Sequence, residues 1–194
     1  MKKLILWDID GTLIYSGGVA GEAMRAAMRR VYGAVSTEER HLYAGKTDQQ
    51  IILETFAERG HDALVGLLDQ FTTVYIEELS ARRDEFLARG CVLDGVAAAL
   101  ERLSTEDLVQ SVLTGNLQPI ARIKLDMMGL ARFLDLDAGA YGSDHHIRAN
   151  LVPVARARAQ QRYGRSFAGA DVWWSATRPT TSTAGAPRAR ARSR

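Results

Sequence analysis

The chain has 194 residues, 46% hydrophobic and 25% charged, a composition typical of a packed core and not of disorder. Its 25 Lys and Arg against 23 Asp and Glu indicate no nucleic-acid or membrane partner. The positive excess comes from residues 172–194, which contain five arginines and no acid. The single cysteine, Cys91, excludes an internal disulfide, and no apolar run reaches the ~18 residues of a membrane span. We therefore expect a cytoplasmic protein.

The first half of the chain predicts one strand followed by a helical block. Residues 4–7 form a continuous apolar run that ends at Asp8, which is typical of a strand buried on both faces of a parallel sheet. Apolar residues then recur at helical spacing through residues 16–88. Within this block we expect helices over 19–32, after a loop at 44–48, and over 64–79. Thr47 or Asp48 is expected to cap the second of these helices.

Strands and helices alternate in the second half of the chain. We expect helices over 96–103, 119–128 and 147–163, and strands over 108–113, over 134–141 with its exit loop, and from 170 onward. This order predicts an α/β fold with a Rossmann-like open, mostly parallel sheet. The expected domains are a discontinuous core of residues 1–15 and 89–174, a helical insert of residues 16–88, and a disordered basic tail of residues 175–194.

Two carboxylates follow the first strand, in the motif Asp8-Ile9-Asp10-Gly11-Thr12. Open α/β sheets bind ligands at the carboxyl ends of their strands, so these side chains are placed to form a site. One carboxylate can attack phosphorus and form an aspartyl-phosphate, while the other protonates the leaving oxygen and then activates water. Their combined charge suits Mg²⁺. The competing interpretation is an ordinary turn, because Asp-Gly is common in turns.

A second polar group follows the strand expected at 108–113. Thr114, Gly115 and Asn116 precede a helix, and a hydroxyl, an unhindered backbone N–H and a helix N-terminus together can hold an anion. Lys124, on the following helix, is the expected cation for a transferring phosphoryl group. Simpler interpretations compete here too: an ordinary strand-to-helix turn for the loop, and a solvated side chain for the lysine.

The order and spacing of these motifs resemble the haloacid dehalogenase-like (HAD) superfamily over nearly all of residues 1–171. The segment from Asp8 to Leu13 resembles its first motif, Thr114-Gly115-Asn116 its second, and Lys124 its third. The helical insert resembles the small cap of the family, and Gly45-Lys46-Thr47-Asp48 resembles the cap loop of phosphoglycolate-phosphatase-like members. The resemblance implies a HAD core with an inserted, all-helical cap.

The resemblance also implies a role for each motif. Asp8 would be the nucleophile and Asp10 the general acid/base. Mg²⁺ would be held by the side chain of Asp8 and by the backbone carbonyl of Asp10. The phosphate would be bound by Thr114, with the Gly115-Asn116 segment beside it, and by Lys124.

The implied reaction is the Mg²⁺-dependent hydrolysis of a small phosphorylated metabolite, with phosphoglycolate as the first candidate. Dehalogenases of the superfamily lack the second aspartate of the first motif, so Asp10 favours phosphoryl transfer. Lys46 in the cap loop would either reach a substrate anion or be solvated, and Thr47 would lie beside it on the substrate side. A phosphomutase, which returns the phosphoryl group to a second hydroxyl of a bound sugar, is the alternative among enzymes.

The sequence departs from the family pattern after Asp171. The fourth motif of the family is usually Gly-Asp-Asp or Gly-Asp-Thr followed by another Asp, and it completes the Mg²⁺ site, yet no acid follows Asp171. Back-translated and read one base earlier, residues 173–182 permit Val-Val-Val-Gly-Asp-Thr-Pro-Asn-Asp-Val, an apolar strand followed by a well-formed fourth motif. We therefore favour a reading-frame shift over a genuine basic tail that binds an acidic surface.

The printed sequence then implies an altered last strand, a missing helix after it, and a Mg²⁺ site that lacks a carboxylate. With less positive charge between them, the repulsion of Asp8 and Asp10 raises a carboxylate pKa and weakens the nucleophile. We expect weak or no phosphatase activity from this chain. The non-enzymatic alternative is a catalytically impaired relative of the family that keeps the fold and still binds the ligand.

Overall fold

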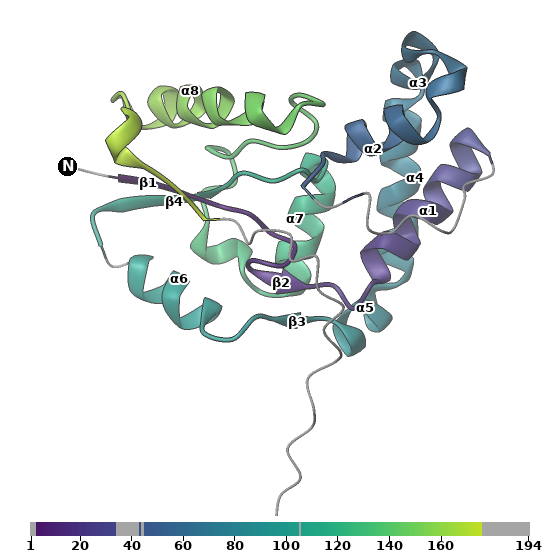
Figure 1. Ribbon diagram of the computed structural model, residues 1–194. Coiled ribbons are helices and arrows are strands. Elements are labelled where there is room, and N and C mark those ends of the chain that lie inside the picture. Colours follow the sequence, from purple (N-terminus) through teal and green to yellow (C-terminus); the bar gives the residue numbers. More distant parts are fainter. Residues whose placement is uncertain (1–2, 34–42, 44, 105, 176–194) are drawn as a thin grey trace, which may run out of the picture.

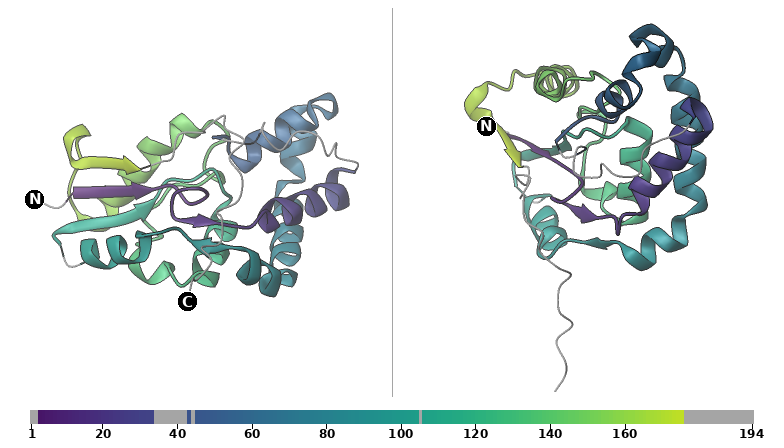
Figure 2. Two further views of the ribbon diagram at one scale, coloured as in Figure 1. Left: turned by 60° about the horizontal axis from the view of Figure 1, so that its bottom comes forward. Right: turned by 45° about the vertical axis from the view of Figure 1, so that its right-hand side comes forward.

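The computed structural model describes residues 3–33, 43, 45–104 and 106–175. These residues fold into a sheet with helices on its faces and a block of helices beside it (Figures 1 and 2). The expected basic tail lies outside the described residues, except for Ser175, which ends the last strand.

The sheet has three parallel strands in the order β4-β1-β5. Its central strand is β1 (Lys3–Trp7), with β4 (Leu108–Val112) on one side and β5 (Val172–Ser175) on the other. The last residue of β1 is paired with the last residue of β4 and with that of β5, so the three strands end together. The expected Rossmann-like α/β fold with a parallel sheet is confirmed.

The two faces of β1 are buried to different extents. Leu4 and Leu6 are fully buried in a cluster with α8 (Leu151–Tyr163), whereas Trp7 is half-buried. A hollow of about 250 Å³ separates Trp7 from α6 (Val96–Ser104). The expectation that both faces are buried is therefore wrong for the second face, because the helix on that side does not pack closely against the strand.

The segment expected to form a strand at 134–141 forms only a single parallel bridge, between Leu113 and Ala140. The Ala140 N–H donates to the Val112 carbonyl at 2.9 Å, so the segment does run beside β4. Further back, however, the Ser111 hydroxyl donates to the Asp135 carbonyl at 2.6 Å. The same carbonyl accepts from the Ala138 N–H at 3.2 Å, and the Asp137 N–H donates to Asp135 Oδ1 at 3.1 Å. The chain therefore turns at residues 135–138, and no regular strand forms there.

Helices connect the strands much as expected. α6 precedes β4, and α7 (Gln118–Met127) follows it with Pro119 in its first turn, where the missing N–H does no harm. The expected helix over 147–163 begins as a 3-10 turn and continues as α8. The 3-10 turns of the described residues are η2 (Ala57–Arg59), η3 (Ala131–Phe133), η4 (Arg148–Asn150) and η5 (Gly169–Asp171).

The described residues of the insert are helical, as expected. Its helices are α1 (Val19–Tyr32), α2 (Asp48–Thr55), α3 (His61–Gly66), α4 (Leu68–Ala81) and α5 (Arg83–Arg89). The single helix expected over 64–79 is divided at Leu67, directly after Gly66, a residue that weakens a helix. Thr47 caps α2, since its hydroxyl accepts from the Gln50 N–H at 3.1 Å. Among the described residues, no helix is long and apolar enough to cross a membrane.

A short two-stranded sheet lies on either side of the helical block in the chain. β2 (Ile14–Tyr15), before α1, pairs antiparallel with β3 (Cys91–Val92), after α5. A Cβ atom at Gly90 would lie 2.9 Å from the Tyr15 carbonyl oxygen, so only glycine fits beside this pair of strands. Two-residue strands carry too short a pattern to be predicted from the sequence.

Candidate active site

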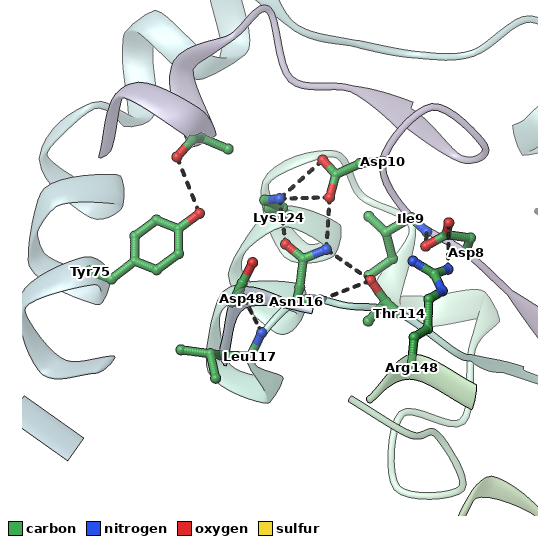
Figure 3. Close-up of polar contacts among 11 residues, drawn as sticks. Asp8, Ile9, Asp10, Asp48, Tyr75, Thr114, Asn116, Leu117, Lys124 and Arg148 are labelled. Carbon is green, nitrogen blue, oxygen red and sulfur yellow. Dashed lines mark hydrogen bonds and ion pairs between the residues drawn. The ribbon is translucent and has the colours of Figure 1, made fainter. Parts of the chain in front are cut away.

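The chain turns sharply after β1, around the buried side chain of Ile9. The Ile9 carbonyl accepts hydrogen bonds from the backbone N–H groups of residues 12–14, at 3.2, 2.9 and 3.1 Å. Gly11 in this turn has a φ of 75°, which glycine adopts without steric cost. With Ile9 fixed in the core, Asp8 and Asp10 both lie at the carboxyl end of the sheet (Figure 3).

Asp8 is paired with Arg148, a cation that the sequence analysis did not single out. The guanidinium lies 2.7 Å from Asp8 Oδ2, and the Ile9 N–H donates to Asp8 Oδ1 at 2.9 Å. Burial raises the pKa of Asp8 above its ordinary value, although Arg148 opposes the shift. Arg148 also lies over the ring of Trp174, with 5.8 Å between the guanidinium carbon and the ring centroid. Asp8 is therefore a shielded carboxylate with one positive charge beside it.

Asp10 lies in a separate network with Lys124 and Asn116 (Figure 3). The Lys124 ammonium donates to both Asp10 oxygens, at 3.0 and 2.8 Å, and to Asn116 Oδ1 at 2.6 Å. Asn116 Nδ2 donates to Asp10 Oδ2 at 2.7 Å. Burial raises the pKa of Asp10, but Lys124 and Asn116 outweigh it and hold the pKa below its ordinary value. The Lys124 side chain is only 3% exposed, so its charge acts within this network.

The loop after β4 adds the remaining predicted phosphate-binding residues. The Thr114 hydroxyl accepts from Asn116 Nδ2 at 2.8 Å, which joins it to the network around Asp10. Gly115 follows without a side chain, and a Cβ atom there would lie 2.2 Å from the Lys46 carbonyl oxygen. The structure therefore brings Asp10, Thr114, Asn116 and Lys124 together in one hydrogen-bonded network.

The loop 45–48 of the insert reaches the same place through its backbone. The Thr47 hydroxyl donates to the His146 carbonyl at 2.6 Å, and the Asp48 N–H donates to the Gly115 carbonyl at 2.8 Å. The ammonium of Lys46, in contrast, is paired with Glu54 on α2. Lys46 and Thr47 thus line the boundary between insert and core, with the Lys46 side chain directed along the insert.

A family model for haloacid dehalogenase-like hydrolases matches residues 5–174. The chain belongs to the haloacid dehalogenase-like hydrolase family. The resemblance seen in the first, second and third motifs is therefore confirmed at the level of the family. A comparison with curated proteins found no match.

Solved structures share the fold at low sequence identity. CbbY from Rhodobacter sphaeroides, in complex with phosphate, is 14% identical with a TM-score of 0.66, over 90% of this chain and 77% of that one. A predicted phosphatase from Clostridium acetobutylicum is 16% identical with a TM-score of 0.60, over 90% and 75% of the two chains. A predicted phosphoglycolate phosphatase from Haemophilus somnus is 17% identical with a TM-score of 0.51, over 89% and 76%.

Two residues of this HAD site were not among the predicted site residues. Arg148 follows a loop, with no motif around it that marks a phosphate-binding cation. Asp48 was considered only as a helix cap and as part of the cap-loop resemblance. The structure buries it to 7% exposure, and the Leu117 N–H donates to its Oδ2 at 2.8 Å. An acid in the first turn of a helix is common, so only the fold distinguishes this one.

Burial of Asp48 predicts a pH-dependent stability. Burial raises its pKa from 3.8 to about 6, against the opposing attraction of Lys124. The folded protein therefore binds this proton more tightly than the unfolded chain, and stability falls as the pH rises from about 4 to about 6. Asp48→Asn removes the titrating group, so it should be the more stable protein above pH 7, by at most about 3 kcal/mol. Urea denaturation of both proteins between pH 4 and pH 8 measures the difference, and equal pH profiles would contradict it.

Proposed function

We propose that this HAD protein is a Mg²⁺-dependent phosphatase of the cytoplasm that hydrolyses a small phosphorylated metabolite through an aspartyl-phosphate at Asp8. The observation that carries the proposal is the pair of carboxylates, Asp8 and Asp10, at the end of one strand. Asp8 is paired with Arg148, and Asp10 is paired with Lys124. The solved structures described as phosphatases support the reaction class, and the one described as a predicted phosphoglycolate phosphatase supports a phosphoglycolate-like substrate.

In the proposed reaction the Asp8 carboxylate attacks phosphorus, and the bond to the leaving oxygen breaks as the new P–O bond forms. Asp10 donates a proton to the leaving oxygen and then takes one from the water that releases phosphate from Asp8. Arg148 and the Thr114–Asn116 loop would stabilise the transferring phosphoryl group. Lys124 holds Asp10 as a carboxylate in the resting protein, so Asp10 has to take up a proton, from solvent or from a singly protonated phosphate ester, before it can donate one to the leaving oxygen. The carboxylate that this donation leaves is the form that then activates water.

The oxygen donors at this strand end suit Mg²⁺, which takes one or two carboxylates together with water and substrate phosphate. The side chain of Asp8 and the backbone carbonyl of Asp10 would hold the ion, which would offset negative charge on the phosphoryl group. Within the described residues, however, no group of three or more acidic, His or Cys side chains could hold a metal. That finding favours the second candidate function, an impaired relative that binds its ligand without efficient turnover.

We also propose that the insert, residues 16–88, acts as a cap over the site and that residues 1–15 and 89–174 form the core. The β2–β3 pair lies where the chain passes between these two parts, α4 packs against α7, and the loop 45–48 meets the Thr114–Asn116 loop. A cap in this place can exclude water and select the substrate.

Hydrolysis of phosphoglycolate and of a panel of phosphorylated metabolites, with and without Mg²⁺, tests the proposed function. Because Asp8 would be the one carboxylate ligand of the metal among the described residues, we expect a kcat at least about 100-fold below the roughly 10 s⁻¹ of a typical enzyme. Asp8→Asn must abolish whatever Mg²⁺-dependent turnover is found.

Each outcome decides between the candidates. Fast Mg²⁺-dependent turnover would establish the phosphatase and contradict the expected impairment. Binding of inorganic phosphate without turnover would support the impaired relative. Transfer of the phosphoryl group to a sugar phosphate instead of water would establish the phosphomutase. A protein that shows no turnover and binds no phosphate would contradict the proposed function itself.

A further inference from the structure

Three consecutive residues of the cap bind two loops of the core. Asp48 makes two hydrogen bonds to the segment Thr114–Leu117, which we call the phosphate loop: its N–H donates to the Gly115 carbonyl at 2.8 Å, and its Oδ2 accepts from the Leu117 N–H at 2.8 Å. Its neighbours Thr47 and Gln49 instead donate to the carbonyls of residues 146 and 143, at 2.6 and 3.1 Å. Asp48 is thus the member of this trio that holds the phosphate loop.

The two bonds of Asp48 lie on either side of Asn116, the residue that joins Asp10 to the phosphate loop. A shift of Gly115 or Leu117 would therefore also move the amide that contacts Asp10. The Asp48 hydrogen bonds are well placed to fix this part of the loop, because both backbone partners lie within it.

The approach of cap and core at this point leaves no room for side chains. A Cβ atom at Gly115 would lie 2.2 Å from the Lys46 carbonyl oxygen, and one at Gly142 would lie 2.0 Å from the Gly115 carbonyl oxygen. Three backbone segments, from the cap loop, the phosphate loop and the loop at Gly142, are therefore stacked directly on one another. Such close packing makes the conformation of the phosphate loop depend on the position of the cap loop.

Capping of α2 does not account for the burial of Asp48. The hydroxyl of Thr47 already caps this helix, and an acid at the first helical position can favour the helix dipole while it stays exposed. A buried carboxylate is instead unfavourable unless it is hydrogen-bonded. The partner that Asp48 finds is the Leu117 N–H, which belongs to the phosphate loop.

We infer that Asp48 is a positioning residue of the cap that holds the phosphate loop, through Gly115 and Leu117, in the conformation that binds a phosphate group. The inference rests on the proposed function, because it takes this loop as the anion site. Seating of the cap loop and binding of phosphate are then linked, and each must strengthen the other by the same factor.

Two substitutions of Asp48 test the inference. Asp48→Ala removes the acceptor for the Leu117 N–H, whereas Asp48→Asn removes the charge and keeps an oxygen acceptor of the same geometry. Gln49→Ala is the matched control, because it removes a neighbouring contact between cap and core whose acceptor, the Ser143 carbonyl, lies outside the phosphate loop. Two quantities are measured on the full chain: the affinity for inorganic phosphate, by calorimetric titration, and the amide hydrogen exchange of residues 113–120.

Asp48→Ala should weaken phosphate binding by about tenfold and accelerate exchange of the Leu117 amide by about tenfold or more. Asp48→Asn should restore both quantities to within about twofold of the parent, and Gln49→Ala should change neither. An Asp48→Asn protein that behaves like Asp48→Ala would overturn the inference, since the charge and not the hydrogen bond would then matter. So would unchanged phosphate affinity in a folded Asp48→Ala protein.

Failure of the proposed function gives a different result. If the parent binds no phosphate, the proposed anion site is wrong, while the exchange of Leu117 in the two variants still shows whether Asp48 holds the loop. If Asp48→Ala does not fold, Asp48→Asn still decides the matter. Parent-like exchange and affinity in that variant support a hydrogen-bonding role, and loss of either contradicts it.

Discussion

Replacing residues 173–182 by the sequence of the neighbouring reading frame is expected to raise Mg²⁺-dependent turnover by about 100-fold or more. The replacement includes Thr177→Asp and Thr181→Asp, which supply the acids of a fourth motif. β5 is paired in parallel with β1, and the Asp8 N–H donates to the Ser175 carbonyl at 3.0 Å. The chain therefore leaves β5 directly beside Asp8, where added carboxylates would complete a metal site worth several kcal/mol to phosphoryl transfer.

A second replacement provides the control. It carries the same new sequence with Asn in place of Asp at positions 177 and 181, so it matches the first in strand sequence and differs in charge. The kcat of both proteins is measured with and without Mg²⁺, after the gene has been resequenced across the codons for Asp171 to Arg178. If the two replacements have equal turnover, or if neither exceeds the parent, the absence of a metal ligand is not the cause of weak activity.

The family match ends close to the last acid of the chain. The matched range stops at residue 174, inside β5, and no acid follows Asp171. Trp173 and Trp174 of β5, an edge strand of the described sheet, are 60% and 52% exposed. Valines, which the neighbouring frame permits at these positions, would expose less apolar surface.

Elements with a strong local pattern were predictable from the sequence. β1 and β4 are short apolar runs, and α1 and α7 carry apolar residues at helical spacing. A few consecutive residues are therefore enough to predict each of these elements. The strand expected at 134–141 failed for a different reason. Its apolar residues fit a strand, but the chain turns at residues 135–138, where the Asp135 carboxylate accepts from the Asp137 N–H. Asp is common in turns, so this signal was local and the apolar pattern hid it.

The residues of the candidate site also divide into those that a local motif marks and those that only the fold brings to the site. Asp8, Asp10 and Thr114–Asn116 were found because each follows a strand in a recognisable motif. Their partners were harder to find, because Arg148 lies 140 residues beyond Asp8 in the chain and the guanidinium reaches the carboxylate only in the folded protein. Lys124 was predicted as a phosphate ligand, whereas the structure directs its ammonium to Asp10 and Asn116. Its contact with phosphate stays a prediction.

Removal of the Lys124 charge is expected to cause the largest loss of stability among the site residues. Lys124→Met should lower the free energy of unfolding by about 2–3 kcal/mol, because it removes charged hydrogen bonds of a lysine that is 3% exposed, although its partner Asp10 is 44% exposed and can regain water. The substitution leaves Asp10 and Asn116 without the donor that joins them, and it leaves the buried Asp48 without its nearby positive charge. The pKa of Asp10 then rises, so the loss should be greater at pH 8 than at pH 5.

Arg122→Met, two residues away on the same helix, is the matched control. Its guanidinium lies 2.5 Å from Asp137, but the two side chains are 38% and 59% exposed, so its removal should change stability by at most about 1 kcal/mol. The double variant Lys124→Met with Asp10→Asn should lose clearly less than the two single losses combined, because both single variants already break the same Asp10–Lys124 contact. Urea denaturation at pH 5 and pH 8 measures all of these effects. A Lys124→Met protein as stable as Arg122→Met would show that the Asp10–Lys124 pair makes no net contribution to the folded state.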